Sequence, residues 1–288
     1  MSVINPTENP RRAYEQLATP DQVPLYDLVP VRGPQGEIIE AYRGVQRRDT
    51  RDVVSVVSSK YSLVQHRTVA NAVHLIGAAL EKPVLDAGAP SFPREQIRLV
   101  AQGRRMEVRL VVGTRYDLSP QDSVFPGVRV MNSLDGSWAV RAEGTGVRVC
   151  CANQLYAGQA SLVELRELHL ASANDLLGML QKAIYAILGR FKDALKTYEA
   201  SMHQEILAED VEPALVAAGL PRIHASAIGT RAEVEATHVG LLSKWSAYQC
   251  ATAYLTHGGV DVNPERARMF ERAAASALLL PAGEAALA

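Results

Sequence analysis

Apolar and polar side chains alternate along the first half of the chain, a pattern typical of β-strands with one buried face. Between residues 23 and 62 the alternating segments are separated by turn signals, the strongest of which runs from Gly33 to Gly36. The predicted strands are 25–31, 37–47 and 53–58. The apolar spacing then becomes helical over residues 66–81, and Pro83 stops the helix. We therefore predict a β-β-β-α start in which one helix covers three strands.

A second block with strand alternation runs over residues 97–152. In its clearest segment, residues 105–112, arginine and glutamate side chains fall opposite an apolar set. Three further segments repeat this pattern near 128–131, 138–143 and 147–151. If these strands pair, one face of the sheet gathers five arginines, namely Arg105, Arg109, Arg129, Arg141 and Arg148.

The second half of the chain has helical spacing. Leu177, Ile184, Phe191 and Tyr198 fall seven residues apart with apolar residues between them, an a/d repeat of about three heptads. The repeat predicts one long helix within residues 163–207. Further helices are predicted at 210–218, 230–257 and 264–279. Two interpretations of the heptad seam remain open: packing against the 230–257 helix, or docking of a partner or a second copy.

These patterns predict an α+β fold, with antiparallel sheet or sheets, a β-β-β-α start and a mostly helical C-terminal half that contains one long helix. The N-terminal residues carry three prolines and many polar side chains. The expected organisation is a flexible arm over 1–22, an α+β domain over 23–158, a helical domain over 159–280 and a frayed tail over 281–288.

Composition places the chain among globular proteins, with 48 % hydrophobic and 21 % charged residues. No apolar run approaches the roughly 18 residues that a membrane-spanning helix requires. The first residues lack the apolar core of a signal peptide, so we expect a cytoplasmic protein with no membrane partner.

The charge count argues against a strongly basic nucleic-acid binder, because 30 Lys and Arg oppose 31 Asp and Glu. It does not exclude a local basic face. Residues 1–158 hold 19 basic and 16 acidic side chains, whereas residues 159–288 hold 11 and 15. Within the first set only Lys60 and Lys82 are lysines, so its positive charge is almost wholly arginine.

Motifs for catalysis or metal binding are missing from the sequence. It has no GxGxxG, GxxxxGK[ST], GxSxG or HExxH motif, and its histidines are scattered along predicted helices. Cys150 and Cys151 are neighbours whose side chains point to opposite faces of a strand, and Cys250 lies alone. We therefore predict no catalytic residue, no metal site and no cofactor.

Residues 131–155 form the densest group of polar side chains. Asp135 and Gly136 predict a tight hairpin, since glycine accepts the positive φ of such a turn. Asn153 falls where the last strand meets the helical half, a position suited to a cap. The group has a structural interpretation, as a hairpin and its connection, and a functional one, as a polar cluster of Asn132, Asp135, Thr145, Arg148 and Asn153.

The same region resembles a known family. Residues 132–137 (NSLDGS) are similar to the N-S-x-D-G-S element of the prokaryotic DUF932 family, also called phage/plasmid-like proteins. Residues 145–155 (TGVRVCCANQL) are similar to its T-x-x-R-V-V-C-A-N-T-L element, and residues 43–65 and 245–257 resemble two further segments. The chain resembles a divergent member of this family, with departures at Arg51, Ser55, Cys150, Gln154 and Gln249. The resemblance implies a context of mobile elements, where replication and recombination functions are common, and no established activity.

We expect a non-catalytic protein that binds or anneals single-stranded DNA, or assists recombination, as a homo-oligomer. The arginines of the predicted sheet face, with Lys60, would contact phosphates. The bases would stack on aromatic rings, for which the candidates are Tyr61, Tyr116 and Trp138. The competing interpretation is an ordinary sheet face whose arginines are neutralised by Glu107 and Glu143.

Two other functions remain open. One is a structural or protein-interaction module that uses the heptad seam of the long helix. The other is an enzyme acting on a nucleotide at the polar cluster of the 131–155 hairpin, although Asp135 has no visible partner base.

Overall fold

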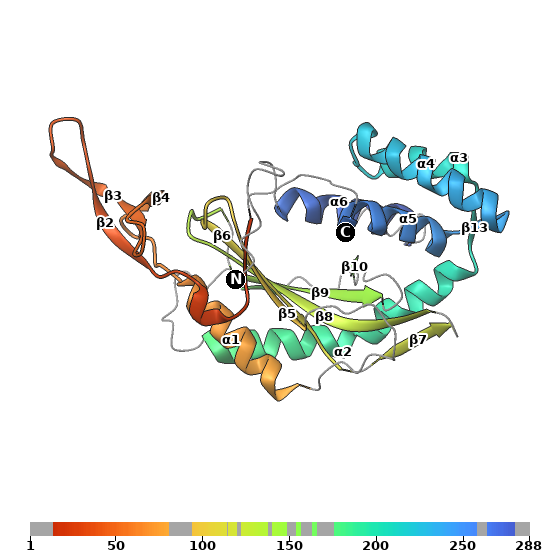
Figure 1. Cartoon of the computed structure of the whole chain (residues 1–288), viewed down its shortest axis with the longest axis horizontal. Coiled ribbons are helices and arrows are strands. Elements are labelled where there is room, and N and C mark those ends of the chain that lie inside the picture. The colour runs from red at the N-terminus through yellow and green to blue at the C-terminus, as the bar shows by residue number, and fades with distance from the viewer. Residues whose placement is uncertain are drawn as a thin grey trace.

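An antiparallel sheet with helices on both faces forms the body of the protein in the computed structural model (Figure 1). The structure describes residues 14–80, 94–113, 115–119, 122–137, 140–148, 154–156, 163–165, 176–257 and 264–279. The strands of this sheet are β1 (Tyr14–Leu17), β5 (Glu95–Val100), β6 (Arg105–Val111), β7 (Tyr116–Ser119), β8 (Asp122–Ser133), β9 (Val140–Arg148), β10 (Gln154–Tyr156) and β11 (Val163–Leu165). Their order is β1-β5-β6-β8-β9-β10, with β7 paired to β8 and β11 paired to β9.

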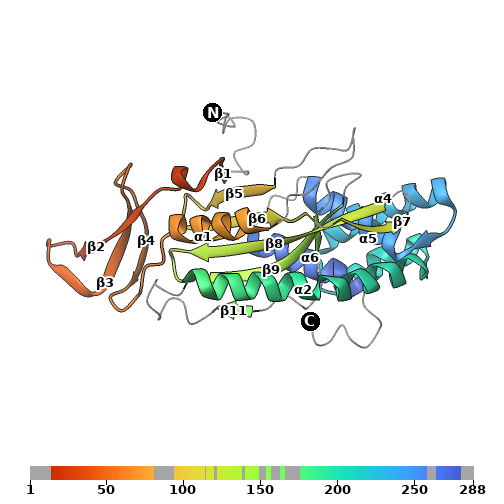
Figure 2. The ribbon, with the colours of Figure 1, turned by 90° about the horizontal axis from the view of Figure 1, so that it is seen from below.

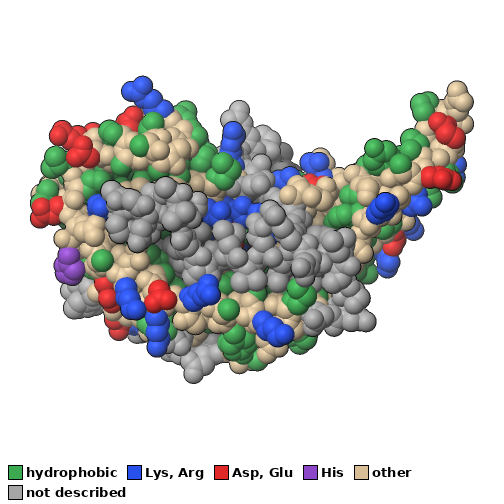
Figure 3. Space-filling view, turned by 180° about the vertical axis from the view of Figure 1, so that it is seen from behind, with side chains coloured by type: hydrophobic (Ala, Val, Ile, Leu, Met, Phe, Trp, Pro, Cys, Tyr) green, Lys and Arg blue, Asp and Glu red, His purple; other side chains and the backbone are tan. Residues whose placement is uncertain are grey.

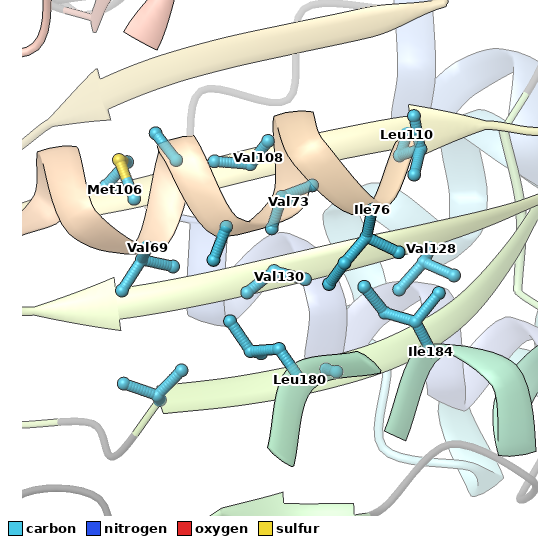
Figure 4. Packing of buried hydrophobic residues seen from close by; sticks show 14 of the residues in the cluster. Val69, Val73, Ile76, Met106, Val108, Leu110, Val128, Val130, Leu180 and Ile184 are labelled. Carbon is cyan, nitrogen blue, oxygen red and sulfur yellow. The ribbon is translucent and has the colours of Figure 1, made fainter. Parts of the chain in front are cut away.

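The alternation in the sequence explains why this sheet has one apolar face. Met106, Val108 and Leu110 of β6 are buried together, and they lie in register with the apolar residues of β5 and β8. Helices α1 (His66–Ala79) and α2 (Leu176–Met202) cover this face, as Figure 2 shows from below. Their side chains interlock with those of the strands (Figure 4). A Cβ at Gly77 of α1 would lie 2.9 Å from Leu110, so glycine permits this close approach.

The remaining helices lie beyond one end of the sheet and over its other face (Figure 1). They are α3 (Ala208–Ala217), α4 (Arg222–Val239), α5 (Lys244–His257) and α6 (Pro264–Leu278). A short 3-10 turn, η1 (Pro20–Gln22), and a pair of two-residue strands, β12 (Glu205–Ile206) and β13 (Leu242–Ser243), complete the elements. Within the described residues, no helix is both long enough and apolar enough to cross a membrane.

A second sheet projects from the body (Figures 1 and 2). It consists of β2 (Tyr26–Arg32), β3 (Ile38–Arg47) and β4 (Val53–Ser58), in that order and all antiparallel. We call it the projecting sheet. At its base Tyr26, Val45 and Val57 are buried with Leu134, which follows β8.

The predicted α+β class, the three N-terminal strands and the one long helix are confirmed. The long helix, however, begins at Leu176, and residues 163–165 are a strand, not its start. The expected 230–257 helix is two helices, which Gly240 separates with a φ of 83°. Residues 14–17 are an edge strand and not part of a flexible arm, because β1 pairs with β5.

Two packing expectations also change. Helix α1 covers the large sheet, not the three strands before it, because its buried residues belong to the cluster of β5, β6 and β8. The heptad seam of α2 packs inside the chain: Leu180 and Ile184 face the sheet, while Phe191 and Tyr198 join the cluster that contains α5. The sheet and the helical half therefore share buried cores.

Candidate functional site

The polar face of the large sheet carries a layer of arginine and glutamate side chains beneath α6. Register places Arg129 of β8 between Arg109 of β6 and Glu143 of β9 on one face. Helix α6 adds side chains from above, including Glu271, which binds Arg129. We call this set the arginine layer, and its members are Arg98, Glu107, Arg109, Arg129, Arg141, Glu143, Arg268, Glu271 and Arg272.

Ion pairs connect the sheet to the helix across this layer. Arg129 Nη2 lies 2.6 Å from Glu271 Oε2, and Arg129 Nη1 lies 3.9 Å from Glu107 Oε2. Arg109 donates a short hydrogen bond to Glu107. On β9, Glu143 Oε1 accepts from Arg268 at 2.6 Å and from Arg272 at 3.2 Å. These contacts fix α6 over the sheet.

The pairs are buried, which makes them strong and costly to break. The side chains of Arg129, Glu107 and Glu143 are 2 %, 3 % and 1 % exposed. Removing one partner of such a pair leaves an uncompensated buried charge and costs about 3–5 kcal/mol. Buried pairing is therefore the first role of the layer.

The pKa values in the layer reflect neighbouring charges of both signs, since Glu271, Glu107 and Glu143 raise the pKa of Arg129 despite its burial. Burial alone would raise the pKa of Glu107, but Arg109, Arg129 and Arg98 outweigh it and hold that pKa at about 2. Burial lowers the pKa of Arg109 to about 10, opposed by Glu107 and reinforced by Arg129 and Arg98. Arg98, Arg109 and Arg129 surround Glu107, while Glu143 and Glu271 pair with arginines of the sheet and of α6. Glu164 of β11 lies in register with Arg141. The layer thus combines basic and acidic residues on one face of the sheet.

Some buried donors in the layer make no hydrogen bond to the described residues. They are Nε of Arg129 and Nε of Arg268, and the acceptor Oε2 of Glu143 is in the same situation. An unsatisfied buried polar atom costs about 1–3 kcal/mol.

One margin of the layer is open to solvent. The Arg109 side chain on β6 is 17 % exposed, and Arg98 on the neighbouring strand β5 is half-buried. Figure 3 shows Lys and Arg side chains near the middle of the rear face of the molecule. An anion can therefore approach along β5 and β6, beside α6.

The other predicted arginines have separate positions. Arg105 is on the same face but at the end of β6, where its Nε lies 3.2 Å from Asp135 Oδ2. Arg148 is on the opposite face, because it lies an odd number of positions along β9 from both Arg141 and Glu143 and pairs in register with Val124. The expectation that all five arginines share one face is therefore wrong for Arg148.

Arg148 instead joins the sheet to α5. Its Nε donates to Asp122 Oδ1 at 2.7 Å, and its Nη1 lies 3.4 Å from Gln249 Oε1. Trp245 Nε1 donates to the other oxygen of Asp122 at 2.9 Å. Arg148 belongs to the 145–155 segment that resembles the family, and Trp245 and Gln249 belong to the 245–257 segment. These two segments therefore contact each other in the fold, directly and through Asp122.

Asn132 belongs to a buried structural network with His66. The Asn132 Nδ2 donates to the Val64 carbonyl and to His66 Nδ1, both at 3.0 Å. His66 Nε2 donates to the Gly103 carbonyl at 3.1 Å, which assigns the ring proton to Nε2. The Tyr26 hydroxyl donates to the same carbonyl at 3.0 Å. Burial lowers the pKa of His66 to about 3, so the ring is neutral.

The polar cluster proposed for the 131–155 hairpin is not one site. Asp135 lies in the turn, where Gly136 has the expected positive φ of 72° and the Ser137 N–H donates to Asp135 at 3.0 Å. Thr145 pairs with Gly127, five residues from Asn132 along β8 and therefore about 17 Å away. The long return strand carries Thr145 and Arg148 away from the turn. Asn153 lies outside the described residues.

The predicted stacking residues do not gather on the layer. Tyr61 donates its hydroxyl to the Ser133 carbonyl at 3.0 Å, and Tyr116 packs on Phe191 at 5.8 Å between ring centroids. Lys60 is exposed just after the projecting sheet. Trp138 lies outside the described residues.

Sequence reasoning missed four members of the layer: Arg98, Arg268, Glu271 and Arg272. Arg98 had a signal, because it alternates with the buried Ile97 and Leu99. The α6 residues recur at helical spacing. Nothing in that spacing indicates that they lie over strands more than a hundred residues earlier.

Possible metal ligands are dispersed over the part of the chain that the structure describes. Three or more His, Cys, Asp or Glu side chains do not gather into a metal-binding group within it. Cys250 is partly buried, and burial raises the pKa of its thiol to about 11. The arrangement is suited to holding an anion.

Comparison with protein-family models matches residues 53–277, most of the chain, to the domain of unknown function DUF932. Searches of curated proteins and of solved structures give no match.

Proposed function

The chain belongs to the DUF932 family, and we propose that it binds single-stranded DNA without catalysing a reaction on it, as an annealing or recombination-accessory protein that acts as an oligomer. The observation that carries the proposal is the row of arginines on the polar face of the large sheet, where Arg98, Arg109 and Arg129 surround Glu107. A phosphate backbone carries the negative charge that such a row of arginines would contact.

Arginine is suited to this role because its planar guanidinium binds phosphate oxygens through two parallel hydrogen bonds. Arg98 and Arg109 lie on neighbouring strands at the open margin, with Arg105 further along β6. Successive phosphates would follow this margin, while the paired glutamates keep the guanidinium groups in place. Glu107 thus acts as a positioning residue for Arg109.

The described part of the layer contains no aromatic ring to stack on a base. Binding would therefore come from phosphate contacts and show little preference for sequence. Such binding weakens steeply with salt, by a slope of about 0.7 in log–log terms for each phosphate contact to a single strand.

The test is a titration of fluorescently labelled single-stranded DNA at low salt with the full chain and two matched double variants. Arg98→Gln with Arg109→Gln removes two charges from the open margin. Arg190→Gln with Lys192→Gln removes two charges from the exposed side of α2. We expect the margin variant to bind at least about tenfold more weakly, because charged hydrogen bonds contribute about 1.5–3 kcal/mol each.

The control variant is expected to bind like the unmodified chain. Circular dichroism of both variants checks that the fold is intact. Failure of the unmodified chain to bind at low salt would overturn the proposal, and so would equal losses in the two variants.

A further inference from the structure

Glu271 of α6 is more exposed than the other two glutamates of the arginine layer. Its side chain is 14 % exposed, whereas Glu107 and Glu143 are 3 % and 1 % exposed. Arg129, which Glu271 binds, is only 2 % exposed. Glu271 thus lies nearer the solvent than the arginine that it holds.

Arg129 lies beside the open margin of the layer. It is in register with Arg109 on the neighbouring strand β6, so the Cα atoms of the two residues are about 5 Å apart. Both guanidinium groups contact one carboxylate, that of Glu107. A phosphate that enters at the margin and binds Arg109 would therefore lie close to Arg129 as well.

The carboxylate of Glu271 acts on both of these arginines. Its Oε2 lies 2.6 Å from Arg129 Nη2. Its charge also opposes the lowering of the Arg109 pKa by burial. A phosphate near the two arginines would be repelled by this carboxylate, because like charges interact strongly where water is largely excluded. Glu271 and a phosphate therefore compete for the same positive charge.

The position of α6 does not depend on Glu271 alone. Glu143 accepts hydrogen bonds from Arg268 and Arg272 of the same helix. The opposite side of α6 packs into the apolar cluster of the helical half, for example through Phe270. The Glu271 side chain can therefore turn into the solvent while α6 stays over the sheet.

We propose that Glu271 is an internal competitor of the DNA phosphate. It holds Arg129 while the site is empty, and an incoming phosphate replaces its carboxylate on Arg129. The inference rests on the proposed function and adds regulation to it, since Arg129 becomes available to a strand only when its pair with Glu271 breaks. Removing the Glu271 charge should therefore strengthen DNA binding. A pair that serves only to fix α6 predicts weaker or unchanged binding.

The experiment titrates labelled single-stranded DNA at low salt with the full chain and the variants Glu271→Gln and Glu233→Gln. Each variant removes one negative charge with little change of shape. We expect Glu271→Gln to bind at least about threefold more tightly than the unmodified chain, because the charge that repels the phosphate is gone. Glu233 is exposed on α4, outside the layer, so Glu233→Gln controls for net charge and should bind like the unmodified chain.

A double variant tests whether the gain depends on Arg129. Arg129→Gln combined with Glu271→Gln removes both charges of the pair, so neither charge is left buried without the other. We expect this variant to lose the gain and to bind no more tightly than the unmodified chain. Urea unfolding of each variant checks that the fold is intact.

Hydrogen exchange of the unmodified chain adds a measurement that needs no variant. The amides of residues 268–272 should exchange faster when DNA is bound, because release of Glu271 removes one contact that holds this turn of α6. Slower exchange there would show that the pair stays intact and would overturn the inference.

The titrations separate this inference from the proposed function. Equal or weaker binding by Glu271→Gln, an equal gain in Glu233→Gln, or a gain that the double variant keeps would each overturn the inference and leave the proposed function standing. Absence of DNA binding in the unmodified chain and in every variant would overturn the proposed function, and this inference with it.

Discussion

At the scale of single residues, His66 and Glu143 show how buried polar groups fix the fold around the candidate site. His66 is completely buried and neutral, and its ring joins α1 to the turn before β6 and to Asn132 on β8. Glu143 is buried under α6, where it accepts from two arginines. Each side chain connects elements that are distant in the sequence.

His66 gives the protein a specific loss of stability in acid. Its pKa is about 3 in the folded chain and near 6.5 when unfolded, so below pH 6.5 the unfolded chain binds a proton that the folded chain does not. The free energy of unfolding should therefore decrease by about 1.4 kcal/mol per pH unit as pH falls from 6.5 toward 4.5. Urea unfolding across this range should show a smaller slope for His66→Gln.

The pH range of this prediction ends at 4.5 because Glu107 contributes a second effect below pH 4.5. Its pKa is about 2 in the folded chain, so its stabilising effect is lost as the pH falls from 4.5 toward 2. His203→Gln, at an exposed position, is the control and should keep the slope of the unmodified chain. Parallel curves for His66→Gln and the unmodified chain would contradict the neutral, buried ring.

Glu143 should be far more important for stability than an exposed acid in an ion pair. Glu143→Gln leaves Arg268 and Arg272 without their shared carboxylate, and we expect a loss of about 3–5 kcal/mol in urea unfolding. Asp193→Asn breaks an exposed pair with Lys196, which should cost no more than about 1 kcal/mol. Similar losses in the two variants would show that the layer is not buried as described.

At the scale of elements, α2 combines two packing roles along one seam. Its first half packs on the apolar face of the large sheet, and its second half packs with α5. The seam that sequence spacing indicates is therefore buried inside the chain from Leu180 to Tyr198, and only its first residue, Leu177, is exposed.

Two leucines on this helix test that assignment. Leu180 is fully buried against the sheet, so Leu180→Ala should lower the free energy of unfolding by about 2–5 kcal/mol. Leu177 is 43 % exposed, and Leu177→Ala should cost less than about 1 kcal/mol. A seam that docks a partner would give small losses for both substitutions in the isolated chain.

Sequence patterns predict a strand or a helix well where apolar and polar residues alternate or recur at helical spacing within the element itself. The strands at 53–58 and 105–111 and the helix that starts at 66 match the alternation and spacing in the chain. The partner of each element depends on distant residues, and this is why α1 covers the large sheet and not the strands beside it. Arg51 shows a similar limit: it has a φ of 65°, where the resembling family has glycine.

The candidate site was predictable only on the sheet side. Alternation places Arg105, Arg109, Arg129 and Arg141 opposite apolar residues, and they share a face in the register of the strands. The same reasoning fails for Arg148, because the apolar residues of β9 change face, from Val140 and Ala142 at its start to Val147 near its end. The cover provided by α6 has no local signal, since ion pairs across more than a hundred residues leave no period in the sequence.

At the scale of the whole molecule, an almost neutral chain gathers many of its arginines in one layer. The 30 basic and 31 acidic residues balance overall, and arginines of the large sheet and of α6 meet in this layer around Glu107, Glu143 and Glu271. The acidic residues that balance the total lie elsewhere, including the first turn of α3. The distribution of charge, more than its sum, thus determines where an anion would bind.

The most direct test of this account is to find where single-stranded DNA contacts the chain. An oligonucleotide with photoreactive bases is cross-linked to the full chain at low salt, and mass spectrometry identifies the modified peptides. The account predicts cross-links on β5, β6 and α6, around Arg98 and Arg109. Cross-links confined to the basic side chains of α2, or to the projecting sheet, would contradict it.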